Sequence, residues 1–194
     1  MVDEETRPSV RTSADQAMSL SDSDDLTQER FLKAMLGAMS STLQDVVGAE
    51  QASGYFASVG TVIAEWLNQA YHAKIGVDDF DIEQLAQVFV DLQRRIDSGF
   101  TVRSIEPDRI VLTNTQCPFG NEILGRSSMC VVTSNIFGRI AAENCGYARV
   151  TLQRTLADGQ GACDVVISFG QTGRVGANTN EYFKVADLPD GDEG

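Results

Sequence analysis

Apolar residues recur every three or four positions along the first half of the chain, and this spacing predicts three amphipathic helices. A capping-box pattern opens the first helix at Asp25 and the third at Asp81, because Gln28 and Gln84 follow three residues later. Glycines are expected to end the first and third helices. The predicted helices run from about Asp25 to Gly48, from Ala49 to Ala73 and from Asp81 to Gly99.

After residue 99 the pattern changes to short runs of alternating residues rich in Val, Ile and Thr, which predict strands. The predicted strands cover residues 100–105, 109–114, 147–156 and 162–169. A fourth helix is expected between them, from about Met129 to Asn144, with Ser127 or Ser128 as its N-cap. Helices followed by strands joined through tight turns define an α+β fold, with an N-terminal helical layer packed on a C-terminal antiparallel sheet.

Charge separates the ends of the chain from its middle. We expect one folded domain over residues 26–170, an acidic flexible tail over residues 1–25 and a second acidic, partly flexible tail over residues 171–194. The net charge of -13 disfavours nucleic acid and anionic membranes as partners, because both would repel the chain. No apolar run reaches the roughly 18 residues of a membrane helix, and the acidic start is unlike a signal peptide. We therefore expect a cytoplasmic protein.

Four cysteines carry the most distinctive chemistry of the sequence, at positions 117, 130, 145 and 163. They form no CxxC pair, so zinc-ribbon, thioredoxin and ferredoxin sites lack their usual spacing. Cys130 and Cys145 lie at opposite ends of the predicted fourth helix, roughly 22 Å apart at 1.5 Å of rise per residue. One metal site cannot contain both, which leaves Cys117, Cys130 and Cys163 as a possible cluster.

Three interpretations of that cluster stay open. The thiols are small buried hydrophobic groups, or ligands of a zinc ion or an iron–sulfur cluster, or reactive redox groups. Cys130 is the best candidate for a thiolate, because a helix N-terminus lowers the pKa of a thiol. Phe119 and Phe137 are expected to wall a ligand pocket beside the cysteines. A Ser–His–Asp hydrolase would depend on His72, the single histidine, and the sequence contains no GxSxG motif for a nucleophilic serine, so we do not expect an enzyme.

Several stretches of the second half form a recognisable set: Asn114–Gly120, Gly125–Thr133, Phe137–Asn144, Gly146–Val150 and Ala157–Cys163. Upstream, Asp45–Gly48, Val59–Gly60 and Asp91–Ile96 extend the set over nearly all of residues 27–170. Together these motifs resemble the methanogen output domain family, which is related to the vinyl-reductase and haem-NO-binding domain group.

The resemblance implies a vinyl-reductase-like fold, a sensory or output role in prokaryotic signalling, and dimers. The zinc pattern of the wider group has a cysteine where this chain has Thr155, and His72 matches no haem ligand motif of the haem-binding relatives. Cys117, Cys130 and Cys163 also resemble the cysteine pattern of iron–sulfur-sensing repressors, but this acidic chain shows no basic recognition helix.

We therefore expect a sensory or regulatory domain that binds a small ligand or a thiolate-held cofactor, zinc or an iron–sulfur cluster. It would form a homodimer and signal to a protein partner, without binding nucleic acid or a membrane. The alternative is a protein-interaction or output module whose cysteines only pack the interior.

Overall fold

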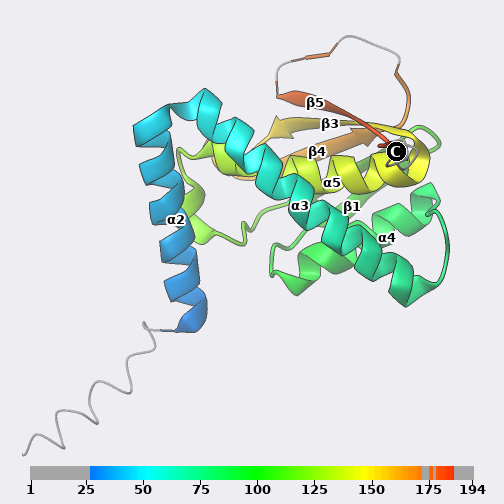
Figure 1. Cartoon of the computed structure of the whole chain (residues 1–194), viewed down its shortest axis with the longest axis horizontal. Coiled ribbons are helices and arrows are strands. Elements are labelled where there is room, and N and C mark those ends of the chain that lie inside the picture. The colour runs from blue at the N-terminus through cyan, green and yellow to red at the C-terminus, as the bar shows by residue number, and fades with distance from the viewer. Residues whose placement is uncertain (1–26, 172–174, 177, 186–194) are drawn as a thin grey trace, which may run out of the picture.

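The computed structural model describes residues 27–171, 175–176 and 178–185, and these form the expected α+β fold (Figure 1). The α-helices are α2 (Gln28–Val47), α3 (Ala49–Ile75), α4 (Ile82–Arg95) and α5 (Cys130–Cys145). The strands are β1 (Thr101–Glu106), β2 (Arg109–Asn114), β3 (Tyr147–Arg154), β4 (Cys163–Ser168) and β5 (Thr179–Phe183). Two short 3-10 turns, η1 (Gly120–Ile123) and η2 (Ser127–Met129), precede α5. The expected tail over residues 1–25 lies outside the described residues.

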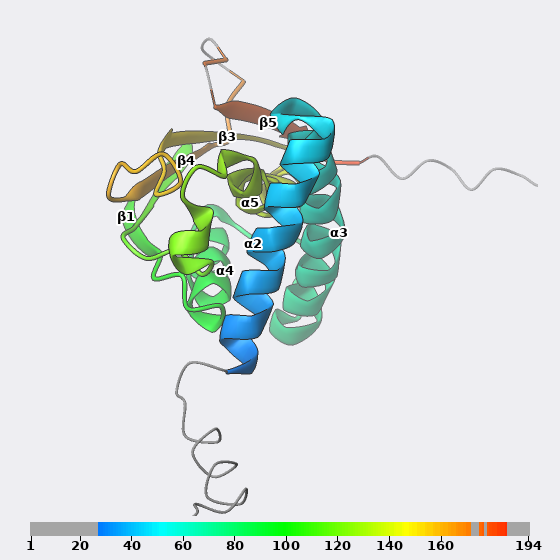
Figure 2. The same cartoon turned by 90° about the vertical axis from the view of Figure 1, so that its left-hand side faces the viewer.

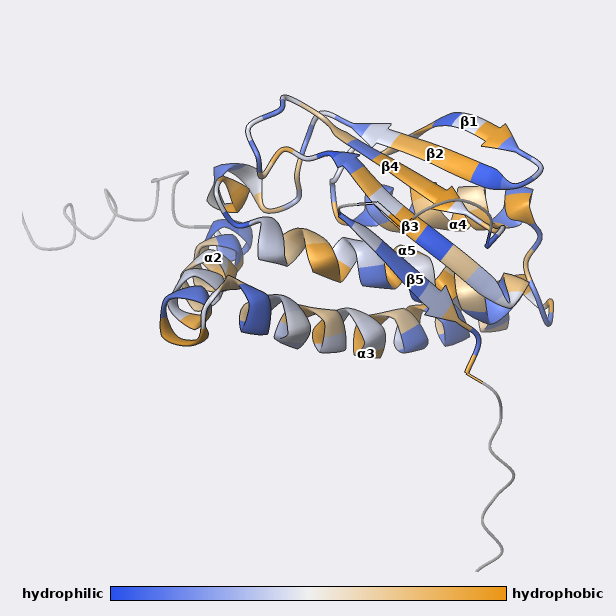
Figure 3. Cartoon of the chain, turned by 90° about the horizontal axis from the view of Figure 1, so that it is seen from above, coloured by the Kyte–Doolittle hydropathy of each residue, from blue (hydrophilic) through white to orange (hydrophobic). Residues whose placement is uncertain are grey.

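The five strands form one antiparallel sheet in the order β1-β2-β4-β3-β5. Helices α4 and α5 lie on one face of this sheet, with α4 against β1 and β2 and α5 mainly against β3 and β5. Helix α3 packs on α5 as an outer layer, and α2 lies at one end of the domain beside the first turns of α3 (Figure 1, Figure 2). Figure 3 shows the apolar stretches of β2, β3 and β4 that the helical layer covers.

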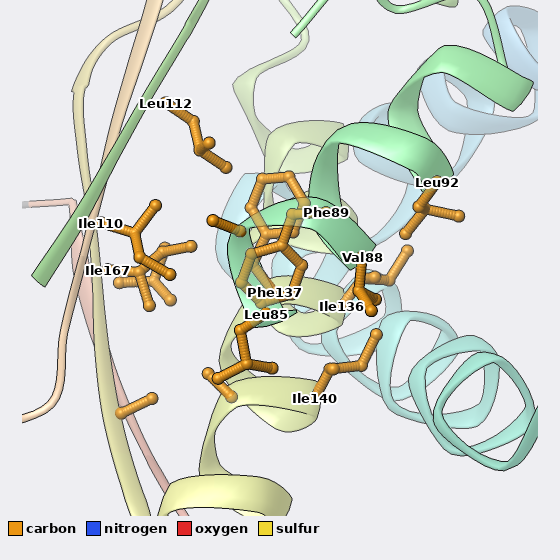
Figure 4. Close-up of a cluster of buried hydrophobic side chains, with 14 of the residues drawn as sticks. Leu85, Val88, Phe89, Leu92, Ile110, Leu112, Ile136, Phe137, Ile140 and Ile167 are labelled. Atoms are coloured by element: carbon orange, nitrogen blue, oxygen red, sulfur yellow. The ribbon is translucent and has the colours of Figure 1, made fainter. Parts of the chain in front are cut away.

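The main core lies between the sheet and the helices and is built around two aromatic rings. The ring of Phe137 on α5 lies 4.8 Å from that of Phe89 on α4 and 5.8 Å from that of Phe100. Ile110 and Ile167 point from the strands toward Phe89 and Phe137 (Figure 4). The side chains of these four residues are fully buried. Phe137 therefore belongs to the core, and the expectation that it walls a ligand pocket is not met.

Strand β5 carries the domain past residue 170, where the sequence pattern placed its end. It pairs with β3 through Ala148 and Tyr182, and Tyr182 is buried against α5. Gly138 makes this packing possible, since a Cβ atom there would overlap the Tyr182 ring. The strand is hard to recognise in the sequence because Tyr182 is its one buried residue.

The helix ends show which capping predictions hold. Asp81 and Gln84 form the predicted capping box of α4, with each side chain accepting a hydrogen bond from the other residue's backbone N–H. Helix α2 is capped by Thr27, whose hydroxyl accepts from the N–H of Arg30, whereas the predicted cap Asp25 lies outside the described residues. The prediction that a serine caps α5 is wrong, because η2 runs into α5 without a side-chain cap.

Candidate functional site

Three cysteines from three separate segments line one small cavity of about 40 Å³, which we call the thiol pocket. Cys163 is the first residue of β4, and the register of the sheet places it opposite Asn114 at the end of β2. The loop that leaves β2 therefore starts beside Cys163 and carries Cys117 into the pocket. Cys130 enters from the first turn of α5, which packs over β3. The three cysteines that were expected to form one cluster thus line the same pocket.

The thiols of this pocket are neutral at ordinary pH. Burial raises the pKa of Cys130 to about 12, and the neighbouring Cys163 and Cys117 add to the rise. Burial also raises the pKa of Cys117 and of Cys163, although the backbone N–H of Leu156 donates to Cys163 Sγ at 3.3 Å. The expectation of a Cys130 thiolate at the helix N-terminus is wrong, because burial disfavours the charged form more than the helix terminus favours it.

The thiol pocket does not fit a zinc ion or an iron–sulfur cluster as the residues are placed. Within the described part of the chain, no three His, Cys, Asp or Glu side chains are grouped closely enough to hold a metal ion. A zinc site also needs a fourth ligand, and the described residues that line the pocket beside the three cysteines include no His, Asp or Glu. The chemistry of the pocket is that of a small, mostly apolar cavity with weakly polar sulfur groups.

The remaining cysteine and the histidine lie elsewhere and do not complete the pocket. Cys145 ends α5, a full helix length from Cys130, and its exposed thiol points toward the Phe80 carbonyl at 4.0 Å. His72 has its Nδ1 2.7 Å from the Val77 carbonyl oxygen, and its ring stacks on Phe80 at 4.3 Å. Both side chains are thus engaged at the far end of α5.

Asn114 lines the pocket together with three other polar residues besides the cysteines, Gln93, Thr133 and Thr155. The Asn114 side chain is 4% exposed, and its amide nitrogen donates to the carbonyls of Ser98 at 2.8 Å and Gln116 at 2.7 Å. Its carbonyl oxygen Oδ1 is buried and has no hydrogen-bond partner among the described residues. Rotating the amide would sacrifice both donated bonds, so the unpaired acceptor is fixed in place. A buried acceptor of this kind favours a ligand or water that donates a hydrogen bond.

Phe119 and Met129 close the pocket on the side of η1 and η2. Phe119 lines the thiol pocket as predicted, in the loop that follows Cys117. Met129 is 3% exposed and lines the pocket from the last position of η2. Its side chain also lines a second hollow, an apolar groove of about 640 Å³ between α2 and α3. Met129 therefore separates the thiol pocket from this α2–α3 groove.

The α2–α3 groove belongs to a large exposed apolar surface. The residues of α2 that are buried in the domain are small, Gly37 and Ser40. Its large apolar side chains are left exposed, with Phe31 at 66%, Met39 at 58% and Val46 at 75%. The side chains of this exposed surface are Phe31, Leu32, Met35, Leu36, Met39, Val46 and Val47 on α2, with Tyr55, Val62 and Trp66 on α3. An apolar groove with many exposed apolar side chains on the two helices that form it is typical of a protein interaction site or a ligand groove.

Comparison with known proteins places this architecture in a family. The methanogen output domain 1 family matches residues 34–168, which is more than half of the chain. The chain belongs to that family. The matched segment starts within α2 and ends with β4, so it contains all residues that line the thiol pocket and the α2–α3 groove, and leaves out β5.

Other comparisons address the fold of this methanogen output domain. The comparison with curated proteins gives no match. Among solved structures, the chain is similar to a trafficking protein particle complex subunit 3 from Naegleria fowleri covalently bound to palmitic acid. The TM-score is 0.52 at 12% identity, over 72% of this chain and 93% of that chain, a likeness that shows the fold alone. Within the described residues, no helix has the length and apolar character needed to cross a membrane.

Two residues of the site escaped the sequence reasoning about this output domain. Asn114 stood in the family-like motif, but nothing in the sequence shows that its acceptor is buried without a partner. Met129 was placed at the start of a helix, whereas its importance comes from lying between two hollows. For α2 the sequence did carry a usable signal, since its large apolar residues share one helix face while the opposite face holds Gly37, Ser40 and Gln44.

Proposed function

We propose that this output domain is a cytoplasmic regulatory module that binds a small neutral molecule in the thiol pocket and signals through protein contacts at the α2–α3 surface. Membership of an output domain family supports the signalling role. The observation that carries the proposal is Met129, which lines both the thiol pocket and the α2–α3 groove. A ligand that displaces Met129 changes the shape of the groove in which a protein partner would dock.

The pocket defines the chemistry of the ligand. A cavity of about 40 Å³ holds only a few non-hydrogen atoms, and its walls are mainly apolar side chains and neutral thiols. The unpaired Asn114 Oδ1 calls for a hydrogen-bond donor. We therefore infer a small uncharged molecule with one donor group and an apolar remainder. The palmitic acid of the trafficking subunit is far larger than this cavity, so we do not extend that ligand to the thiol pocket.

An interaction module with purely structural cysteines is the second candidate function. The neutral, partly buried thiols support it, since they need no role beyond packing. It shares the α2–α3 surface with the first proposal but requires no ligand. The unpaired acceptor of Asn114 favours the first proposal, because a purely structural pocket gains nothing from a buried acceptor without a partner.

Two isomeric probes distinguish these candidates. Ethanol can donate a hydrogen bond to Asn114, whereas dimethyl ether has the same atoms and no donor. In an amide NMR titration of the full chain, we expect ethanol to shift the Asn114 and Cys130 signals saturably and more strongly than dimethyl ether does. Equal shifts from both probes, or no saturable shift, would overturn the ligand proposal. The Asn114→Leu variant should lose the preference for ethanol over dimethyl ether. If this variant does not fold, the comparison of the two probes on the natural protein is decisive by itself.

A further inference from the structure

Helices α3 and α4 lie next to each other (Figure 1), and a hollow of about 380 Å³ between them forms what we call the α3–α4 groove. Its lining is largely apolar and includes Leu67, Ala70 and Leu92. The volume is in the range of small-molecule sites, whose walls are mostly apolar with a few well-placed polar groups. The groove is separate from the thiol pocket and from the α2–α3 groove, since it shares no lining residue with either.

The charged residues of the α3–α4 groove are cations, although the chain as a whole is acidic. Among the described residues that line the groove, the charged ones are Lys74 on α3 and Arg95 on α4. The Lys74 ammonium is exposed and has no hydrogen bond or ion pair with any described residue. In a chain with a net charge of -13, two cations beside one apolar hollow favour an anionic ligand.

Asp91 fixes the position of Arg95 and joins the two helices. Arg95 donates through Nε to Asp91 Oδ2 at 2.7 Å, and the hydroxyl of Tyr71 on α3 donates to the same oxygen at 2.9 Å. Arg94 donates to the other carboxylate oxygen at 2.6 Å, so one carboxylate serves two guanidinium groups and positive charge is left over. Because a guanidinium carries several N–H donors, Arg95 can bind a second carboxylate while it keeps Asp91.

Trp66 supplies an aromatic wall two helical turns before Lys74. It is 65% exposed and lies roughly 12 Å from Lys74 along the axis of α3. Ala70 is on the same helix face between them, and its small side chain leaves the space above the helix open. The side chain of a helical lysine leans toward the helix N-terminus, which here is the direction of Trp66. A ring stacked on Trp66 therefore has a short path to the Lys74 ammonium.

From these contacts we propose that the α3–α4 groove binds a small aromatic carboxylate, with its ring against Trp66 and its carboxylate between Lys74 and Arg95. The inference does not rest on the function proposed for the thiol pocket. A positively charged ligand would suit the Trp66 ring by itself, but Lys74 and Arg95 would repel it. A neutral aromatic ligand would leave both cations without a role in binding.

An apolar groove bordered by solvated cations would behave differently from this site. Lys and Arg side chains commonly cover apolar surface with their methylene groups while their charges stay in water. Such a groove accepts an aromatic molecule equally well with or without a carboxylate. The preference between a charged and a neutral ligand therefore decides whether Lys74 and Arg95 take part in binding.

Phenylacetate and phenylacetamide are matched probes, because they have nearly the same shape and differ in charge. Trp66 is the single tryptophan of the chain, so its fluorescence reports on this groove in the natural protein. We expect phenylacetate to change the fluorescence saturably and to bind about fivefold more tightly than phenylacetamide, through two partly exposed ion pairs. Added salt should reduce this preference, because it screens the ion pairs. Equal affinities for the two probes, or no saturable change with phenylacetate, would overturn the inference.

Variants test the two ends of the groove. Lys74→Gln should lower the affinity for phenylacetate about two- to fivefold and leave that for phenylacetamide unchanged. The matched control is Lys33→Gln on α2, which removes the same charge outside the groove and should change neither affinity. Trp66→Leu should weaken the binding of both probes, measured by calorimetry because this variant has no tryptophan.

Two results with these variants would also overturn the inference: a preference for phenylacetate that is unchanged in Lys74→Gln, and phenylacetate binding that is unchanged in Trp66→Leu. The Asn114→Leu variant should bind phenylacetate as the natural protein does. Failure of this inference and failure of the ligand proposal for the thiol pocket are therefore distinguishable.

Discussion

The hydroxyl of Ser128 donates a hydrogen bond of 2.7 Å to the side-chain carbonyl of Gln44, and this bond ties α2 to the turn that leads into Cys130. Ser128 is followed directly by Met129, which separates the thiol pocket from the α2–α3 groove. The exposed helix of the domain is therefore anchored to the segment that also forms a wall of the pocket. A displacement of Met129 in the pocket would therefore act on α2 directly, through the groove and through the neighbouring Ser128–Gln44 hydrogen bond.

Removing this anchor should loosen α2. We expect Ser128→Ala to lower the free energy of unfolding by about 1 kcal/mol, because it removes the hydrogen bond that buried Ser128 donates to the partly buried Gln44. Amide exchange over residues 28–47 should accelerate, while β3 keeps its protection. Urea unfolding and hydrogen exchange measure both effects. Ser53→Ala is the control, since its exposed hydroxyl bonds only within α3. An effect confined to β3 would contradict this role.

The packing of α3 on α5 depends on a glycine and offers a matched pair of variants. A Cβ atom at Gly60 would lie 2.7 Å from Asn135 Cβ and 2.9 Å from the Val132 carbonyl oxygen. We expect Gly60→Ala to destabilise the fold by about 1–3 kcal/mol through this overlap. At Gly54, where no atom lies within 4 Å, alanine should stabilise by about 0.5–1 kcal/mol through helix propensity. Thermal unfolding of both variants checks the pair, and equal shifts would contradict the close crossing.

The raised pKa values predict an order of thiol reactivity. With its pKa near 12, Cys130 has about a thousandfold less thiolate at neutral pH than a thiol at the reference value of 9.0. Exposed Cys145 should therefore react with iodoacetamide first and Cys130 last. Mass spectrometry of the labelled peptides over time measures this order in the native protein, with the urea-unfolded chain as control. Labelling of native Cys130 as fast as Cys145 would show that its thiol is not buried as described.

Asp164 predicts a pH dependence on the outer face of the sheet. Hydrogen bonds from Arg154 Nε at 2.6 Å and Thr113 Oγ1 at 2.7 Å lower the pKa of Asp164 below its ordinary value of 3.8. A lowered folded-state pKa stabilises the fold above about pH 4, and this contribution disappears as the pH falls through the folded-state pKa.

Asp164→Asn should therefore cost about 1 kcal/mol at pH 7, an amount limited by the half-exposed Arg154. The difference from the natural protein should shrink between pH 4 and pH 2. Urea midpoints across that range measure it, with Asp78→Asn as an exposed control. A difference that stays constant with pH would contradict the charged hydrogen bonds.

The sequence predicted the elements whose apolar pattern is regular and missed the strand that has only one buried residue. The apolar stripe and capping box of α4 are local features, so its start at residue 82 followed from Asp81 and Gln84. Strand β5 was missed because its pairing with β3 is long-range and Tyr182 alone is buried. Ser128 resembled a helix cap but donates to Gln44 on another helix, a contact that no local pattern contains.

For the site, the sequence could predict which cysteines lie together but not the chemistry of the pocket that they line. Helix geometry alone separated Cys145 from Cys130, and the strand pattern placed Cys163 inward. The pKa shift of Cys130 was predicted in the wrong direction, because the sequence shows the helix N-terminus, which lowers the pKa of a thiol, but does not show the burial that raises it. The orientation of the Asn114 amide depends on the carbonyls of Gln116 and of Ser98, and the Ser98 contact joins separate segments, so sequence patterns could not reveal the unpaired acceptor.

Methionine methyl NMR tests the central claim, that the thiol pocket communicates with the α2–α3 surface, most directly. The chain has five methionines; Met129 lies between the two hollows, and Met39 lines only the groove. When ethanol is titrated into methyl-labelled protein, we predict that the Met129 and Met39 signals shift together with one apparent dissociation constant. Met39 in the Asn114→Leu variant should not respond. A saturable shift of Met129 with an unmoved Met39 would contradict the coupling and leave the pocket without influence on the surface.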